Sequence, residues 1–124
     1  MIKIVIQPQG TLAIYEQIVY QLKNAIVQGG LVAGEALPSI RALAAELQVS
    51  VITTKRAYEE LEKEGLLRSV AGKGFYVCEN NTDYLREKQL MMLENRLSEL
   101  IEEAKGAGLD CEELIEMVRT LYGA

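Results

Sequence analysis

Apolar residues recur every three or four positions over residues 12–28, which is the spacing of an amphipathic helix. Ile14, Ile18 and Leu22 share one face of this segment, and Gly29 follows where a left-handed helix end is favoured. The pattern predicts a first helix that buries one face against other elements.

Two shorter helices are predicted next, separated by a tight turn at residues 48–49. Ser39 and Ser50 are the candidate N-caps, because a serine hydroxyl can accept a hydrogen bond from a free backbone N–H of the first turn. Gly65 ends the second of these helices. The inward faces are predicted to hold Ile40, Leu43, Ala44 and Leu47 in one helix, and Thr54, Ala57, Tyr58 and Leu61 in the other.

Residues 66–69 and 75–78 are short candidate strands around a loop at residues 70–74. Gly72 and Gly74 in that loop suit a tight hairpin turn. Residues 1–5 are β-prone and predict an extended arm or an edge strand. Two short helices at a tight turn, followed by a hairpin, are typical of a winged helix-turn-helix.

The polar run at residues 79–82 is the expected boundary between a domain at residues 1–78 and a region at residues 79–124. Residues 83–105 predict a long helix, and a last helix is expected after Asp110, with Glu113 completing a capping box. Two helices alone cannot enclose a core, so we expect the same hairpin of a second subunit to cover them. The alternative is that the apolar faces of these two helices pair with each other within one chain. The expected dimerisation residues are Leu90, Leu93, Leu97, Leu100, Leu114, Val118 and Leu121.

The chain has 124 residues and a net charge of -5, but the charge is unevenly distributed. Residues 1–78 carry eight basic and seven acidic side chains, whereas residues 79–124 carry five basic and eleven acidic ones. The acidic tail is therefore not expected to lie against phosphate.

The chain has no histidine and two isolated cysteines, so we expect no metal site and no cofactor. No nucleophile or carboxylate pair has a recognisable context, so an enzyme is not expected. No signal peptide or membrane helix is evident, and the expected compartment is the cytoplasm.

Candidate DNA contacts cluster at the start of the helix that Ser50 opens, where Thr53, Lys55 and Arg56 follow. Lys55 and Arg56 are adjacent and point about 100° apart, so both cannot serve one groove equally, and we rank Lys55 first. Lys73 at the hairpin tip is a second candidate contact. A solvated helix face and an ordinary hairpin loop are the simpler interpretations of these residues.

Several motifs together resemble the GntR family of bacterial transcriptional regulators. They are YEQI at 15–18, LPSIRALA at 37–44, VS at 49–50, AYEELEKEGL at 57–66 and GKG at 72–74. The short tail resembles the YtrA subfamily, in which the tail is a dimerisation element. The resemblance implies a mainly α fold with a small β wing, in which a winged helix-turn-helix precedes a two-helix dimerisation hairpin.

The resemblance also implies DNA contacts from the arginine of the PSxR segment, the start of the recognition helix and the wing. Their counterparts here are Arg41, Ser50, Thr53, Lys55, Gly72 and Lys73. Many relatives have Arg at the position of Val51, so contact of Val51 or Ile52 with a thymine methyl group is conceivable. Relatives often have Gly at the position of Gln48, where a left-handed residue would be mildly strained.

The leading hypothesis is a sequence-specific transcriptional regulator, acting as a repressor, that binds a partly palindromic double-stranded operator as a homodimer. A small-molecule effector of unknown identity is compatible with it. The alternative is a winged-helix protein interaction module without sequence-specific DNA binding, which the near balance of charges in residues 1–78 keeps open.

Overall fold

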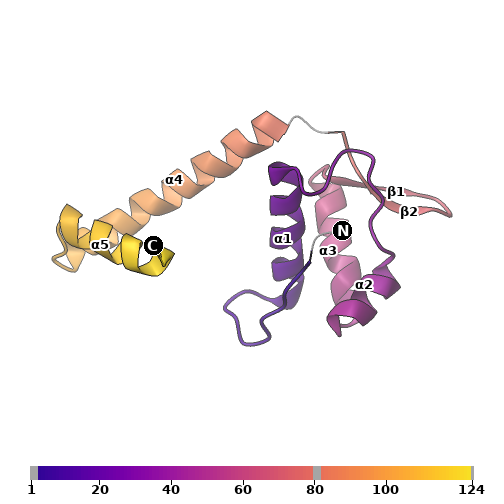
Figure 1. Cartoon of the computed structure of the whole chain (residues 1–124), viewed down its shortest axis with the longest axis horizontal. Coiled ribbons are helices and arrows are strands. Elements are labelled where there is room, and N and C mark those ends of the chain that lie inside the picture. Colours follow the sequence, from indigo (N-terminus) through magenta and orange to yellow (C-terminus); the bar gives the residue numbers. More distant parts are fainter. Residues whose placement is uncertain (1–2, 80–81, 124) are drawn as a thin grey trace. The chain divides into compact units, whose positions relative to one another are not determined.

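The computed structural model describes residues 3–79 and 82–123. The chain divides into two compact units, Met1–Leu85 and Arg86–Ala124. The elements, labelled in Figure 1, are α1 (Ile14–Gln28), α2 (Ile40–Leu47), α3 (Val51–Lys63), β1 (Leu67–Val70), β2 (Gly74–Val77), α4 (Thr82–Gly106) and α5 (Cys111–Tyr122). The predicted order of helices and strands is confirmed.

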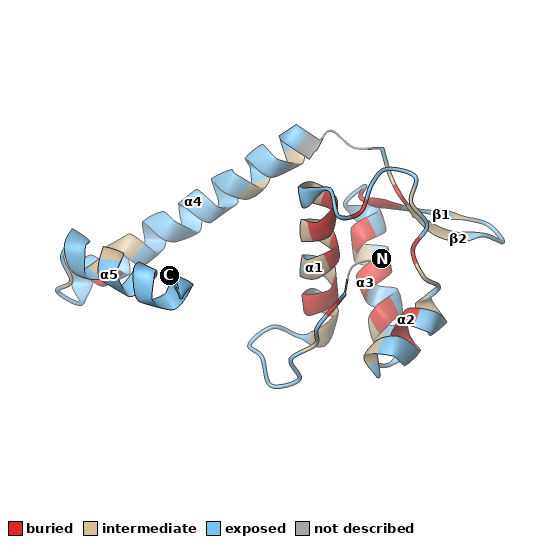
Figure 2. Cartoon of the chain, in the orientation of Figure 1, coloured by how far each residue is buried: buried red, intermediate tan, exposed pale blue. Residues whose placement is uncertain are grey.

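The core of the first unit lies between α1, α2 and α3. In Figure 2 the buried residues of α1 and α3 face each other, and α2 packs on α3. Ile18, Leu22, Leu43, Tyr58 and Leu61 are fully buried there. Because the inner face of α3 is held in this way, its outer face is presented to solvent in a fixed orientation.

Local capping determines where the helices begin. The N–H of Ala42 donates to Ser39 Oγ at 3.0 Å, and the N–H of Thr53 donates to Ser50 Oγ at 3.0 Å, which confirms both predicted caps. The first helix begins at Ile14 and not at residue 12 as predicted. Ala13 has an extended backbone, and its N–H donates to the Glu16 carboxylate at 3.3 Å, so the helix starts after it.

The two strands of the hairpin are confirmed, but β1 begins and ends one residue later than predicted and β2 begins and ends one residue earlier. The strands pair antiparallel from Leu67 opposite Val77 to Val70 opposite Gly74. Residue 66 lies outside the strand because its N–H donates to the Leu61 carbonyl at 2.9 Å and closes the end of α3.

The segment before α2 lies along β2. The N–H of Leu37 donates to the Phe75 carbonyl, and the N–H of Val77 donates to the Glu35 carbonyl, both at 2.9 Å. The pattern of apolar residues did not predict this pairing. Its hydrogen bonds fix the base of the wing to the chain that leads into α2.

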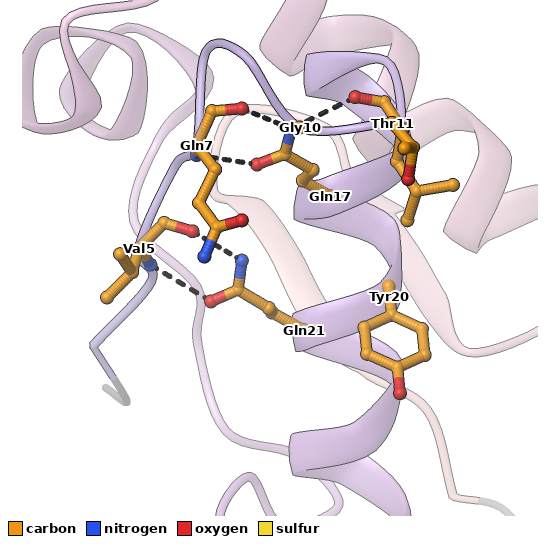
Figure 3. Close-up of a pocket in the computed structure, with 8 residues that line it drawn as sticks. Val5, Gln7, Gly10, Thr11, Gln17, Tyr20 and Gln21 are labelled. Carbon is orange, nitrogen blue, oxygen red and sulfur yellow. Dashed lines mark hydrogen bonds between the residues drawn. The ribbon is translucent and has the colours of Figure 1, made fainter. Parts of the chain in front are cut away.

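The N-terminal arm is extended but is not a strand, and two glutamines of α1 bind its backbone (Figure 3). Gln17 accepts the N–H of Gln7 at 2.8 Å and donates to the Gln7 carbonyl at 2.8 Å. Gln21 does the same with Val5, at 2.9 and 2.7 Å. Four helical residues, the separation of Gln17 and Gln21, rise by about 6 Å, and two extended residues span about 6.6 Å, so the two spacings match. Of the predicted segment 1–5, residues 1–2 lie outside the described part of the chain.

The second unit contains most of α4, followed by α5. The predicted capping box is confirmed: the N–H of Glu113 donates to Asp110 Oδ1 at 2.9 Å, and the N–H of Asp110 donates to Glu113 Oε1 at 3.1 Å. Helix α4 begins at Thr82, one residue earlier than predicted, and ends at Gly106. Asn80 and Asn81, in the predicted boundary at 79–82, lie outside the described residues.

Candidate nucleic-acid interface

The N-terminal tip of α3 carries two apolar side chains that project from a capped helix end. Val51 is 44% exposed and Ile52 is 80% exposed. Beside them, Ser50 Oγ donates to Thr53 Oγ1 at 2.7 Å while it accepts the N–H of Thr53. Thr53 is half-buried, unlike its exposed neighbours Val51 and Ile52. Its hydroxyl proton is still available to a phosphate oxygen, because its oxygen is the acceptor in the bond to Ser50.

The outer face of α3 continues from Ile52 to Lys55, Arg56 and Glu59, which follow at helical spacing. Lys55 Nζ lies 3.7 Å from a carboxylate oxygen of Glu59, and both side chains are well exposed. The guanidinium carbon of Arg56 lies 3.7 Å from the centroid of the Tyr15 ring. Lys55 is therefore free to exchange its weak partner for a phosphate, whereas Arg56 would have to leave an aromatic ring.

A buried tyrosine holds α3 against the chain that leads into α2. Tyr58 is fully buried, and its hydroxyl donates to the Pro38 carbonyl at 2.8 Å. Its ring meets Phe75 of β2 edge to face, with centroids 5.0 Å apart. Burial raises the pKa of Tyr58 above its ordinary value, and the negative charge of Glu46 adds to this effect. The phenol therefore remains a neutral hydrogen-bond donor at physiological pH.

The turn between α2 and α3 contains a non-glycine residue in the left-handed region. Gln48 has φ 57° and ψ 43°, and its N–H donates to the carbonyls at the end of α2. The sequence predicted mild steric strain for a non-glycine residue in this left-handed region. The left-handed turn sets the direction in which α3 leaves α2.

The other predicted cationic contacts lie on α2 and at the wing. Arg41 is exposed at the second position of α2. Lys73 is exposed at the hairpin tip, next to Gly72, which has φ 75°. The wing is braced on α3 by Glu62, whose Oε2 accepts from Ser69 N–H at 3.1 Å and Ser69 Oγ at 2.8 Å.

A family model of bacterial regulatory proteins, the gntR family, matches residues 14–77, which cover α1 to the end of the wing. The chain belongs to the GntR family. It is a DNA-binding transcription regulator, and its fold is a winged helix-turn-helix.

Among relatives of this GntR protein, the transcriptional repressor YtrA of Bacillus subtilis is 36% identical over 94% of the chain and 89% of YtrA. A solved structure of a transcriptional antiterminator from Listeria monocytogenes is 30% identical, with a TM-score of 0.75, and covers 98% of this chain and 90% of that one. The DNA-binding domain of AraR, solved with operator ORX1, is 28% identical with a TM-score of 0.55, over 61% of this chain and 95% of that one. The predicted resemblance to the family and to YtrA is confirmed.

The predicted dimerisation residues of the GntR chain lie on α4 and α5. Leu90, Leu93, Leu97 and Leu100 are about half exposed in the single chain, and so is Val118. Leu121 is 80% exposed, and Leu114 is half-buried. Of the apolar side chains of the second unit, only Ala104 is buried among the described residues. These helices therefore leave a row of apolar side chains without cover.

Three contacts were not predicted: Arg56 on Tyr15, Glu62 with Ser69, and the glutamines of α1 on the arm. Each joins two different elements of the fold, and no local pattern marks such a pair. None of the helices in the described residues is both long and apolar enough to cross a membrane.

Proposed function

We propose that the protein binds a double-stranded DNA operator as a homodimer and represses transcription from it. The observation that carries this proposal is the exposed N-terminal tip of α3, held rigid by the Ser50 cap and by the buried Tyr58. The first residues of a recognition helix meet base edges in the major groove. AraR, a structural neighbour, was solved on its operator, which supports the same use of this surface.

Each predicted contact has a separate role in this proposal. Val51 and Ile52 face the bases, and Ser50, Thr53 and Lys55 bind the phosphates beside them. Arg41 and the wing, through Gly72 and Lys73, hold the flanking backbone. Arg56 acts mainly by bracing α3 on α1 through the Tyr15 ring, and it adds positive charge near the groove. These contacts fix the register of the protein on the duplex.

Dimerisation is proposed to occur through residues 79–124, and DNA binding through residues 1–78. The support for this division is the uncovered apolar row on α4 and α5, because large apolar side chains in such a row are expected to be buried against a partner. A closed dimer is two-fold symmetric, so the operator is expected to be partly palindromic. Repression is proposed because YtrA of Bacillus subtilis, a relative that matches 94% of the chain, is a repressor.

The test is selection from a random duplex library with the purified protein, followed by titration of the selected duplex and a scrambled duplex at several salt concentrations. We expect a two-fold motif that binds at least ~10³ tighter than the scrambled control. Light scattering at the same protein concentration is expected to give twice the mass of one chain. Equal affinity for both duplexes would overturn the proposal and favour a protein interaction module.

A further inference from the structure

Ile52 is the most exposed large apolar side chain described within residues 3–79, at 80%. It lies at the second position of α3, two residues after the Ser50 cap. Covering an exposed isoleucine with another apolar group removes apolar surface from water and stabilises the complex. Because its branched side chain has one strongly preferred rotamer in a helix, little entropy is lost when it is covered.

The polar groups on the same face are unsuited to reading guanine from this end of α3. The first turn, residues 51–54, carries no charged residue. Farther along the face, Lys55 lies next to Glu59, and Arg56 lies on the Tyr15 ring. Guanine is read most often by an arginine or lysine that reaches O6 and N7. At the tip of α3 the most exposed apolar group available for contact with a base edge is the Ile52 side chain, at 80% against 44% for Val51.

The major groove offers one prominent apolar group, the C5-methyl of thymine. We propose that Ile52 is a specificity-determining residue that selects an A·T pair in each operator half-site by packing on this methyl group. The inference rests on the proposed function, because it requires α3 to enter the major groove. It adds the identity of the base that the tip of α3 selects.

The experiment replaces each thymine of the selected operator, one position at a time in both half-sites, by uracil. Uracil keeps the Watson–Crick pair and lacks only the methyl group. Covering one methyl-sized group is worth about 0.8 kcal/mol, which is about fourfold in affinity, so two half-sites give about 15-fold. We expect one symmetric pair of thymines at which uracil weakens binding of the unaltered protein by about this factor.

Ile52→Ala identifies the side chain responsible. Its affinity for the thymine operator is expected to fall by about the same factor, and the uracil substitution is then expected to change it less than twofold. Val51→Ala is the matched control, because Val51 is the neighbouring apolar residue and is only 44% exposed. This control is expected to keep the full thymine-to-uracil difference. Both variants shorten solvent-exposed side chains, so circular dichroism is expected to show the same helix content.

An enriched operator that binds equally well with uracil at every position would overturn the methyl contact and leave the proposed function intact. A uracil effect that persists in Ile52→Ala would overturn the assignment to Ile52. Failure to enrich any motif would overturn the inference and the proposed function together.

Discussion

The guanidinium of Arg56 on α3 stacks on the ring of Tyr15 on α1, with its carbon 3.7 Å from the ring centroid. An exposed cation on an aromatic ring contributes about 0.5–1 kcal/mol. We therefore predict a coupling free energy of that size between Arg56→Ala and Tyr15→Leu in a double-mutant cycle measured by urea unfolding. The control cycle pairs Lys55→Ala with Tyr15→Leu, and its two effects are expected to be additive. Additivity in both cycles would show that the stacking contributes nothing.

Gln48→Gly is expected to stabilise the protein, because Gln48 has φ 57° and glycine adopts this region without a steric penalty. The left-handed region costs a residue with a Cβ roughly 1 kcal/mol, and part of the gain is lost to the greater freedom of glycine in the unfolded chain. We predict a free energy of unfolding higher by about 0.5 kcal/mol, measured by urea titration.

The matched control for this change is Ala45→Gly, an exposed position within the right-handed part of α2. There glycine is expected to lower the free energy of unfolding by about 1 kcal/mol. A loss of stability at both positions would contradict the strain at Gln48.

Tyr58→Phe is expected to lower the free energy of unfolding by about 1 kcal/mol at pH 8, because the Pro38 carbonyl loses its donor. Burial raises the pKa of Tyr58 in the folded protein. The unfolded chain therefore releases this proton first, near pH 10, and the stability that the neutral phenol provides is lost as the pH rises further. The difference in stability between the two proteins is expected to shrink above about pH 10. A difference that stays constant with pH would contradict this linkage.

Lys73→Ala is expected to weaken binding to the operator and to the scrambled duplex by similar factors, because a wing cation contacts phosphate and not a base edge. The slope of log affinity against log salt is expected to fall by about 1 per subunit. Lys105→Ala is the control: Lys105 is an exposed lysine of α4 that lies 3.5 Å from Glu102. An unchanged slope in Lys73→Ala would exclude a phosphate contact by the wing.

Leu97→Lys is expected to dissociate the proposed dimer, because it places a charge in the middle of the apolar row of α4. Light scattering is expected to give the mass of a single chain, and operator affinity is expected to fall. Asn95→Lys adds the same charge on the opposite side of α4, where a dimer is expected to tolerate it. A Leu97→Lys protein that keeps the dimer mass would place the interface elsewhere.

Local sequence signals predicted most of the winged helix. Ser39, Ser50 and Asp110 marked helix starts correctly, because a cap is formed by residues within one turn of each other. The strand ends were predicted one residue off, because the N–H of residue 66 is bound to the end of α3. A local pattern cannot specify that bond.

The candidate contacts were also predictable only where they are local. Ile52 and Lys55 follow from their position after the Ser50 cap. The partner of Arg56 did not follow, because Tyr15 reaches it only when α1 packs on α3. No local pattern around Tyr15 indicates this partner.

The glutamine pair on α1 binds the arm without reading its side chains, because the hydrogen bonds go to main-chain atoms of Gln7 and Val5. Gln17 also donates to a main-chain atom nearer α1, the Leu12 carbonyl, at 3.0 Å. Any two residues that alternate along an extended segment could form the same four hydrogen bonds. The hydrogen bonds alone therefore leave several alignments of the arm equal in energy. Ile4 removes this degeneracy, because its side chain is buried in the core of the first unit. The burial of Ile4 thus selects one alignment of the arm from several that the glutamine hydrogen bonds would stabilise equally.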